Sequence, residues 1–256
     1  MTGTGHGLRL EGVTLALHRR LLLGPLTLAV APGSIATLMG PSGCGKSSLL
    51  AHLCGTLDPA FAAGGRVLLD DVELDPLPPE RRRLGILFQD DLLFPHMTVG
   101  ENLAFGLPAA VRGAAERRGR VEAALAEAGL AGFASRDPAT LSGGQRARAT
   151  LMRSLLSEPR ALLLDEPFSR LDAALKDRFR QFVFDHARTL SLPTLMVTHD
   201  PADAAAAGGP LIDLAAGLAP GQAARQTPVA SRSGTAEQGA LQPVGQPKGQ
   251  PGATRR

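Results

Sequence analysis

The chain has 256 residues, and 44% of them are apolar, which is enough to bury one large hydrophobic core or two small ones. The formal net charge is +3, but residues 218–256 hold five Lys or Arg against one acidic residue, which leaves the other 217 residues near −1. A basic tail on a nearly neutral body does not favour nucleic-acid binding. We therefore expect no nucleic acid among its partners.

The cysteines and the apolar runs indicate the compartment. Cys44 and Cys54 lie ten residues apart without a second pair, so the sequence supports neither a disulfide framework nor a zinc site. The first residues lack a charged segment followed by an apolar one, and no apolar run approaches the roughly 18 residues of a spanning helix. We expect a protein of a reducing cytoplasm that is neither exported nor embedded in a membrane.

In chain order, residues 8–30 come first and predict an antiparallel β layer. Apolar and polar residues alternate there as in half-buried strands, and the turn signal at residues 31–33 closes the segment. Short apolar runs follow that are typical of buried strands, and helical segments separate several of them, which favours a mostly parallel sheet in an α/β fold. These runs are residues 35–39, 67–69, 84–88, 161–164 and 194–197.

The segment of about residues 92–158 predicts an inserted helical subdomain within a domain of residues 1–217. Its apolar residues recur at helical spacing, as at Val121 and Leu125. Beyond this domain the chain is rich in Gly, Gln, Pro, Ala and Ser and has few large apolar residues. Too little apolar surface is available there to offset the entropy of ordering, so we expect residues 218–256 to be a disordered low-complexity tail.

Residues 40–47 match a P-loop, a glycine-rich loop between a predicted strand and a predicted helix. Glycines let backbone N–H groups close around phosphate oxygens, Lys46 reaches the β- and γ-phosphates, and Ser47 can ligate Mg²⁺. The alternative is a chance glycine turn, and Cys44 occupies a variable position where we infer no thiol chemistry. The predicted nucleotide-binding residues here are Gly40, Pro41, Ser42, Gly43, Cys44, Gly45, Lys46, Ser47 and Ser48.

Residues 161–166 predict a catalytic carboxylate. An apolar run ends in Asp165 and Glu166, which places Asp165 as a magnesium ligand and directs Glu166 toward the γ-phosphate. A carboxylate at that place can polarise the attacking water, a role that phosphoryl transfer to water requires. The alternative is a strand-to-turn boundary with two solvated acids.

Residues 141–145 form a second glycine-rich helix start. Small residues at a helix N-terminus make an anion site. Because one chain rarely needs two such elements for one nucleotide, we infer that this element serves the nucleotide of a second copy, which predicts a homodimer with two composite sites. The alternative is an ordinary glycine-rich cap. The residues concerned are Ser142, Gly143, Gly144 and Gln145.

Two more polar residues lie just past predicted buried strands. Gln89 follows residues 84–88, and His199 comes soon after residues 194–197. In open α/β sheets, ligands bind outside the carboxyl ends of the strands. We therefore predict that Gln89 contacts Mg²⁺ or the attacking water, and that His199 contacts the γ-phosphate and holds Glu166 in place.

In this order and spacing, the segments resemble the motifs of the ABC ATPase family over about residues 8–215. They are Walker A (40–47), the Q-loop (Gln89), the signature (141–145), Walker B (161–166), the D-loop (169–172) and the H-loop (His199). The resemblance implies a P-loop NTPase fold, hydrolysis of ATP with Mg²⁺, a nucleotide-sandwiched homodimer, and Asp172 of the D-loop near the nucleotide. It also implies an integral membrane permease as a separate partner and a place at the cytoplasmic face of the membrane.

Residues 88–102 look like the importer version of the Q-loop region, in which the surface after the glutamine meets the coupling helix of the permease. This implies import, with a periplasmic or extracellular solute-binding protein as a further partner. The short C-terminus and residues 85–90 and 165–172 look most like YnjD-type subunits, which are described as thiamine-transport ATPases. That solute rests on the resemblance alone.

Three features depart from the family pattern. Relatives place an aromatic residue against the adenine about 29 positions before the Walker lysine, where this chain has Leu17 and no Tyr or Trp anywhere. The D-loop carries Arg170 where a small residue is usual. The C-terminal regulatory domain of sugar-importer relatives is not expected. The first departure predicts a shallow preference for adenine over guanine.

Two other readings of the family resemblance stay open. Non-transport ABC proteins of translation carry two cassettes, and those of DNA repair carry long insertions. A single cassette with about a hundred residues between Walker A and the signature disfavours both. An ATPase of an exporter or of a lipid-extraction complex is the other alternative, and the importer-like residues 88–102 disfavour it.

Overall fold

The computed structural model describes residues 7–90, 92–214 and 226–227. Its first strands form a four-stranded antiparallel sheet in the order β2-β1-β4-β5. The two-residue turn between β1 and β2 has positive φ at His18 (47°) and Arg19 (68°), a backbone that matches the twist of paired strands. The predicted antiparallel layer is therefore confirmed. Its strands are β1 (Leu8–Leu17), β2 (Arg20–Val30), β4 (Phe61–Leu69) and β5 (Val72–Glu73).

The sequence predicts that the apolar run at residues 67–69 belongs to the parallel sheet, and this prediction is wrong. The run is the end of β4, and it pairs antiparallel with the start of β1, with Leu69 opposite Leu8 and Val67 opposite Leu10. A short apolar run identifies a buried strand, but its partner is set by contacts about 60 residues away in the chain. The direction of the pairing is therefore not readable from the run itself.

The other four runs form β3, β6, β7 and β8 of the predicted parallel sheet, whose strand order is β10-β9-β3-β8-β7-β6. In the part of this sheet that the structure describes, strands β9, β3, β8, β7 and β6 run parallel, and β10 at the edge is antiparallel. Both faces of the sheet are covered, which fits the fully buried apolar strands β7 and β8. The strands are β3 (Ile35–Met39), β6 (Leu84–Leu87), β7 (Ala161–Asp165), β8 (Thr194–Val197), β9 (Leu211–Asp213) and β10 (Gln226–Thr227).

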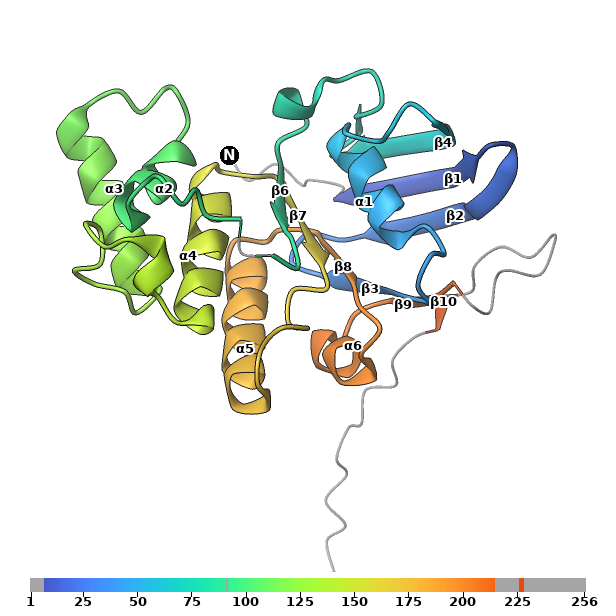
Figure 1. Ribbon diagram of the computed structural model, residues 1–256. Coiled ribbons are helices and arrows are strands. Elements are labelled where there is room, and N and C mark those ends of the chain that lie inside the picture. The colour runs from blue at the N-terminus through green and yellow to red at the C-terminus, as the bar shows by residue number, and fades with distance from the viewer. Residues whose placement is uncertain (1–6, 91, 215–225, 228–256) are drawn as a thin grey trace, which may run out of the picture.

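The helices divide into two groups that adjoin each other in Figure 1. Helices α1 (Lys46–Cys54), α5 (Ala173–Thr189) and α6 (Pro201–Ala207) accompany the sheets, whereas α2 (Val99–Phe105), α3 (Ala114–Glu127) and α4 (Gly143–Leu156) gather at one side. Short 3-10 turns lie at Pro79–Arg81 and Pro138–Thr140. All three gathered helices fall within residues 92–158, and the bounds of the helical subdomain stay a prediction.

Three apolar clusters form the core. The first joins α1 to the strands of both sheets, and the second packs α4 and α5 against the parallel sheet. The third lies within α2, α3 and α4 and gives the helical subdomain a core of its own. The fold is thus α/β with an antiparallel layer and a helical insertion, as predicted.

The residues predicted to form a disordered tail lie mostly outside the described part of the chain. Within that segment the structure describes Gln226–Thr227, which pair with Ile212 and Leu211 of β9. Residues 218–225 and 228–256 are not described, so their predicted disorder stays a prediction. Over the described ranges, none of the helices has the length and apolar character to cross a membrane.

Candidate functional site

The loop between β3 and α1 has the geometry of a phosphate-binding loop. Gly43 and Gly45 have positive φ values of 79° and 92°, a backbone that favours glycine, and α1 begins directly afterwards at Lys46. Lys46 is 8% exposed, and its ammonium donates hydrogen bonds of 2.8 Å to the carbonyl oxygens of Gly40 and Pro41. The lysine therefore lies along the inside of the loop that precedes it.

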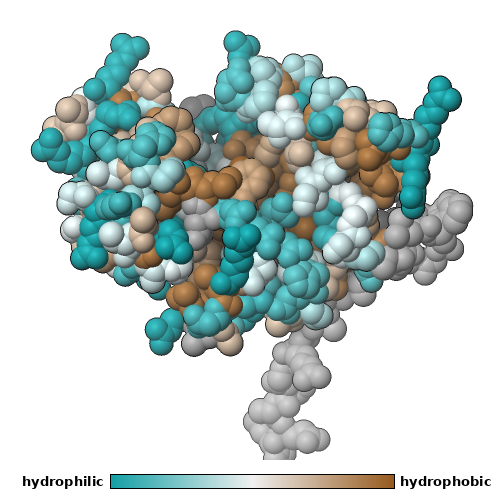
Figure 2. Space-filling view, viewed as in Figure 1, coloured by the Kyte–Doolittle hydropathy of each residue, from teal (hydrophilic) through white to brown (hydrophobic). Residues whose placement is uncertain are grey.

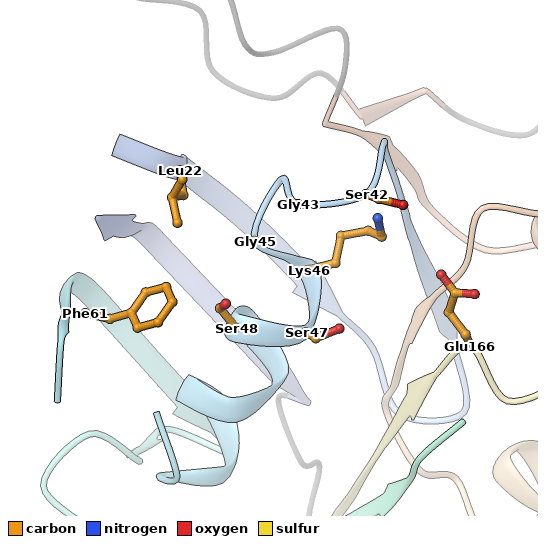
Figure 3. Close-up of a pocket in the computed structure, with 9 residues that line it drawn as sticks. All are labelled: Leu22, Ser42, Gly43, Gly45, Lys46, Ser47, Ser48, Phe61 and Glu166. Carbon is orange, nitrogen blue, oxygen red and sulfur yellow. The ribbon is translucent and has the colours of Figure 1, made fainter. Parts of the chain in front are cut away.

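A pocket of about 350 Å³ opens over this loop (Figure 3). In Figure 3, Leu22 and Phe61 lie at one end of the pocket and Glu166 at the other, with the glycine-rich loop and the start of α1 between them. The pocket is lined by Leu22, Ser42, Gly43, Gly45, Lys46, Ser47, Ser48, Phe61 and Glu166. Leu17, predicted to face the base, is not among these residues, whereas Leu22 and Phe61 were not predicted.

Asp165, the last residue of β7, lies beside the P-loop. The Ser47 hydroxyl donates to Asp165 Oδ1 at 3.4 Å. Burial raises the pKa of the Asp165 carboxyl, and the Ser47 hydrogen bond lowers it while the Glu166 charge raises it further. Two neighbouring hard oxygen donors, one of them a half-buried carboxylate, fit the oxygen ligands that Mg²⁺ takes beside substrate phosphates.

Glu166 contacts His199 across the ends of two adjacent parallel strands. His199 Nδ1 lies 2.8 Å from Glu166 Oε2, a distance at which the imidazole N–H donates to the carboxylate. Glu166 has a positive φ of 46°, and its backbone N–H donates to the Val197 carbonyl at 2.9 Å. The strained backbone turns the side chain out of the strand direction and into the pocket.

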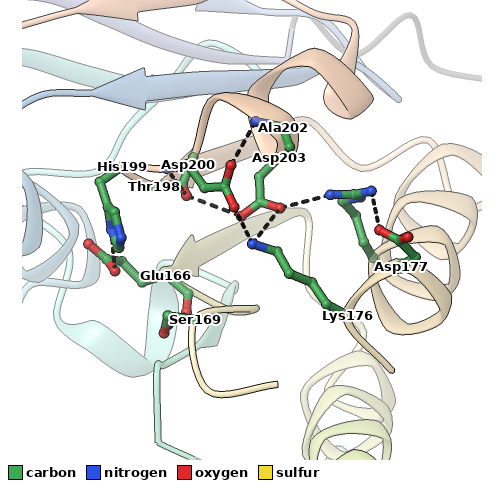
Figure 4. Close-up of polar contacts among 10 residues, drawn as sticks. Glu166, Ser169, Lys176, Asp177, Thr198, His199, Asp200, Ala202 and Asp203 are labelled. Atoms are coloured by element: carbon green, nitrogen blue, oxygen red, sulfur yellow. Dashed lines mark hydrogen bonds and ion pairs between the residues drawn. The ribbon is translucent and has the colours of Figure 1, made fainter. Parts of the chain in front are cut away.

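A network of charged residues lies beside His199, on the loop and helix that follow it and on α5 (Figure 4). Asp203, 2% exposed, accepts from the Thr198 hydroxyl at 3.2 Å, and the Thr198 oxygen in turn accepts from the Asp200 backbone N–H. Lys176 of α5 pairs with both Asp200 and Asp203, and Arg180 pairs with Asp203 at 3.0 Å. The network ties α5 to the loop that carries His199. The sequence did not predict it, because residues more than 20 positions apart form it.

The signature residues start α4 through a capping box. The Ser142 hydroxyl accepts from the Gln145 backbone N–H at 3.4 Å, and the Gln145 side chain accepts from the Ser142 backbone N–H at 2.9 Å. A Cβ on Gly144 would lie 2.6 Å from a methyl of Leu175, so a larger residue there would require the Leu175 side chain to move. A Cβ on Gly143 would meet nothing within 4 Å. None of the signature residues 141–145 is among those that line the pocket over the P-loop.

The remaining predicted residues lie nearby on loops and helix starts. Gln89 is exposed just after β6, and Asp172 caps α5 by accepting from the Leu175 backbone N–H at 3.0 Å. Arg170, the unusual D-loop residue, forms an ion pair with Asp90 beside the Q-loop glutamine. Strands β3, β8, β7 and β6 are parallel neighbours, and their carboxyl ends therefore lie on the same side of the sheet. Gly40, His199, Asp165 and Gln89 lie at or just past these carboxyl ends.

The comparisons with known proteins agree with this geometry. The family described as "ABC transporter" matches residues 23–169. The chain is 52% identical over 193 residues to the Escherichia coli protein named "Uncharacterized ABC transporter ATP-binding protein YnjD", covering 75% of this chain and 88% of that one. It is 38% identical to the spermidine/putrescine import ATP-binding protein PotA of Bacillus cereus, covering 77% of this chain and 59% of PotA.

Two further comparisons concern a third relative and the fold. The Fe(3+) ions import ATP-binding protein FbpC of Rhizobium etli is 42% identical, with 73% of this chain and 52% of FbpC covered. The chain therefore spans little more than half the length of PotA and FbpC. A solved structure entitled "Dimeric Structure of MJ0796, a Bacterial ABC Transporter Cassette" superposes with a TM-score of 0.68 at 29% identity, covering 81% of this chain and 94% of that one. The chain therefore belongs to the ABC transporter family, as one of its ATP-binding, ATP-hydrolysing subunits.

Proposed function

We propose that the chain binds Mg²⁺ and ATP in the pocket over the P-loop and that Glu166 is the base that polarises the attacking water. The observation that carries this proposal is that Glu166 lines the same pocket as Lys46 and Ser47. The P-loop amides and Lys46 bind the phosphates, while His199 orients the Glu166 carboxylate through their 2.8 Å contact. Ser47 and Asp165 would hold Mg²⁺, which neutralises phosphate charge when it is bound.

We also propose that each site is completed by a second copy of the chain. Ser142 and Gly144 begin a helix whose start carries no acidic residue in its first turn, and they do not line their own chain's pocket. A helix start of this kind binds anions. The phosphates of the nucleotide in the pocket of a partner copy would be that anion. The solved cassette to which the chain is similar is described as dimeric. Asp172 and Gln89 would lie near the same interface.

The proposed role of the dimer is to drive solute import through a separate membrane permease, from the cytoplasmic face of the membrane and with a solute-binding protein outside. Two relatives at 38% and 42% identity are named as import proteins. Hydrophobic surface is visible near the middle of the face in Figure 2. The segment after β6 and helix α2 expose three large apolar side chains, Phe88 (42%), Leu92 (51%) and Phe105 (65%), which suit a protein partner.

The transported solute does not follow from these comparisons. PotA and FbpC are named for spermidine/putrescine and for Fe(3+) ions, and YnjD is named without a solute. Relatives of similar identity thus serve chemically different solutes, which fits selection of the solute by the membrane and binding partners. The thiamine assignment therefore has no support from the relatives compared.

Mixing two inactive variants tests the composite site. Lys46→Ala removes the phosphate contact within one chain, and Ser142→Arg blocks the helix start that serves the other chain. In a mixed dimer one site carries both defects and the other site carries neither, so ATPase activity should return in part on mixing. Lys46→Ala mixed with Glu166→Gln is the matched control, because both defects lie in the same pocket and each mixed dimer keeps a defect in both sites. Recovery in the control, or none in the test pair, would contradict the proposal.

A further inference from the structure

We propose that Phe61 stacks on the base of the bound nucleotide and so takes the role that the family resemblance assigns to position 17. The pocket has two chemically different ends. Lys46, Ser47 and Glu166 form a polar end, whereas Leu22 and Phe61 form an apolar end that includes an aromatic ring. A nucleotide has the same division into an anionic polyphosphate and a flat aromatic base.

The P-loop determines the orientation of the nucleotide in the pocket. The phosphates bind to the loop at residues 40–47 and to the start of α1, and the hydrolysed phosphate lies next to Glu166. The base must then extend away from Glu166. In Figure 3 that direction leads along the P-loop toward Leu22 and Phe61. Phe61 is the only aromatic residue among those that line this pocket.

The strand register explains how Phe61 reaches the place expected for residue 17. Leu17, the last residue of β1, pairs directly with Phe61, the first residue of β4. Side chains of directly opposed residues in antiparallel strands lie on the same face of the sheet, about 4.5–5.5 Å apart at Cβ. A ring from β4 can therefore cover nearly the same space as a ring from the end of β1.

The backbone before Phe61 is fixed by a tight turn. The Phe61 N–H donates to the Asp58 carbonyl at 3.0 Å, and the Ala60 N–H donates to the Asp58 carboxylate at 2.8 Å. These bonds define how the chain enters β4 and hence the direction in which the half-buried Phe61 side chain leaves the backbone. A ring held in advance loses less entropy when a base stacks on it. His18 and Arg19, the other candidates near the end of β1, are exposed in the hairpin turn and do not line the pocket.

This inference rests on the proposed phosphate site, and the test separates the two. Calorimetric titration with Mg²⁺ and ADP measures base and phosphate binding together, and titration with Mg²⁺ and tripolyphosphate measures the phosphate part alone. Phe61→Leu keeps an apolar side chain but removes the ring, so ADP should bind roughly five- to a hundredfold more weakly. Tripolyphosphate binding should not change, which also shows that the variant is folded. GDP should weaken along with ADP, because stacking does not read base edges.

Two control variants define the role of the ring. Phe61→Tyr should restore ADP affinity to within about twofold, since the ring is kept. Leu17→Ala should leave ADP affinity unchanged. In the ATPase assay, Phe61→Leu should raise KM and leave kcat nearly unchanged, because the base is bound equally in the ground and transition states.

A spectroscopic test follows from the absence of tryptophan in the sequence. Phe61→Trp introduces one fluorophore, whose emission should change on addition of ADP but not of tripolyphosphate. Normal ADP affinity in Phe61→Leu, or loss of affinity in Leu17→Ala instead, would overturn the proposal. If wild type fails to bind tripolyphosphate, the phosphate site itself is wrong and this inference falls with it. If tripolyphosphate binds normally and the emission of Phe61→Trp does not change on addition of ADP, only the role of Phe61 is refuted.

Discussion

His199 Nδ1 lies 2.8 Å from Oε2 of Glu166, which joins the ends of strands β8 and β7 through two side chains of the proposed catalytic centre. The His199 side chain is 67% exposed, so its removal leaves little cavity. His199→Ala should therefore lower kcat by about a hundredfold through loss of a positioned polar group, with a nearly unchanged melting temperature. His96→Ala, at another exposed histidine, is the control. A large loss of melting temperature together with normal kcat would contradict this role.

The network beside His199 should matter for stability as well as for activity. Asp203 is 2% exposed and faces two cations, so Asp203→Asn leaves Lys176 and Arg180 without their buried partner. We expect a loss of roughly 3 kcal/mol in the free energy of unfolding and a lower kcat. Asp177→Asn breaks an exposed ion pair to the same Arg180 and should cost at most about 1 kcal/mol. Urea unfolding of both variants checks the difference, and equal losses would refute the special role of Asp203.

Asp200 adds an acid-dependent part to this network. Its hydrogen bond from Lys176, followed by the one from the Ala202 N–H, lowers the pKa of the Asp200 carboxyl. A carboxyl whose folded-state pKa is depressed stabilises the fold above its ordinary pKa, near 4, and this stability is lost as the pH falls through the lower folded value. Asp200→Asn should therefore reduce the free energy of unfolding at pH 7 and flatten its decline below about pH 4. Parallel pH profiles for wild type and variant would contradict the assignment.

The pH dependence of stability that is due to Asp165 should have the opposite sign to that of Asp200. Burial, the main cause, raises the pKa of its carboxyl, so the associated stability is full below the ordinary pKa and is lost as the pH rises through the folded value. Asp165→Asn mimics the neutral acid and should melt at the same or a higher temperature than wild type at pH 7. The stabilisation that Mg²⁺ and ATP give to wild type should shrink in this variant, because the proposed magnesium ligand is lost. A lower melting temperature without ligand at pH 7 would show that ionised Asp165 supports the fold.

Removal of residues 218–256 should have little effect. The described part of this segment pairs only Gln226 and Thr227 with β9, at the edge of the sheet. Loss of two edge residues should lower the melting temperature by no more than about 2–4 °C and leave the ATPase rate unchanged. Truncation after Gly208 is the contrasting variant, because it also removes β9 with its fully buried Ile212. A fall of many degrees on removal of residues 218–256 would show that the tail is part of the fold.

Motifs on contiguous segments were readable from the sequence, whereas contacts between distant segments were not. Residues 35–39 and 194–197 were predicted with the bounds that the structure shows, because each is a short apolar run closed by turn residues. The place of Phe61 depends on the pairing of β1 with β4, and the Asp203 network depends on how α5 packs beside the His199 loop. Neither leaves a local pattern. The resemblance therefore directed attention to Leu17, while the neighbouring strand carries the ring.

The most direct test of the central claim is the size of the Glu166→Gln variant with and without ATP. If Glu166 is the base of a site completed by a second copy, this variant keeps ATP binding and loses most turnover, by about 10²–10⁴-fold. Light scattering should then show a monomer without nucleotide and a stable dimer with Mg²⁺ and ATP, and adding Ser142→Arg to the same chain should abolish that dimer. A Glu166→Gln variant that hydrolyses ATP at a near-normal rate, or that stays monomeric with bound ATP, would contradict the account.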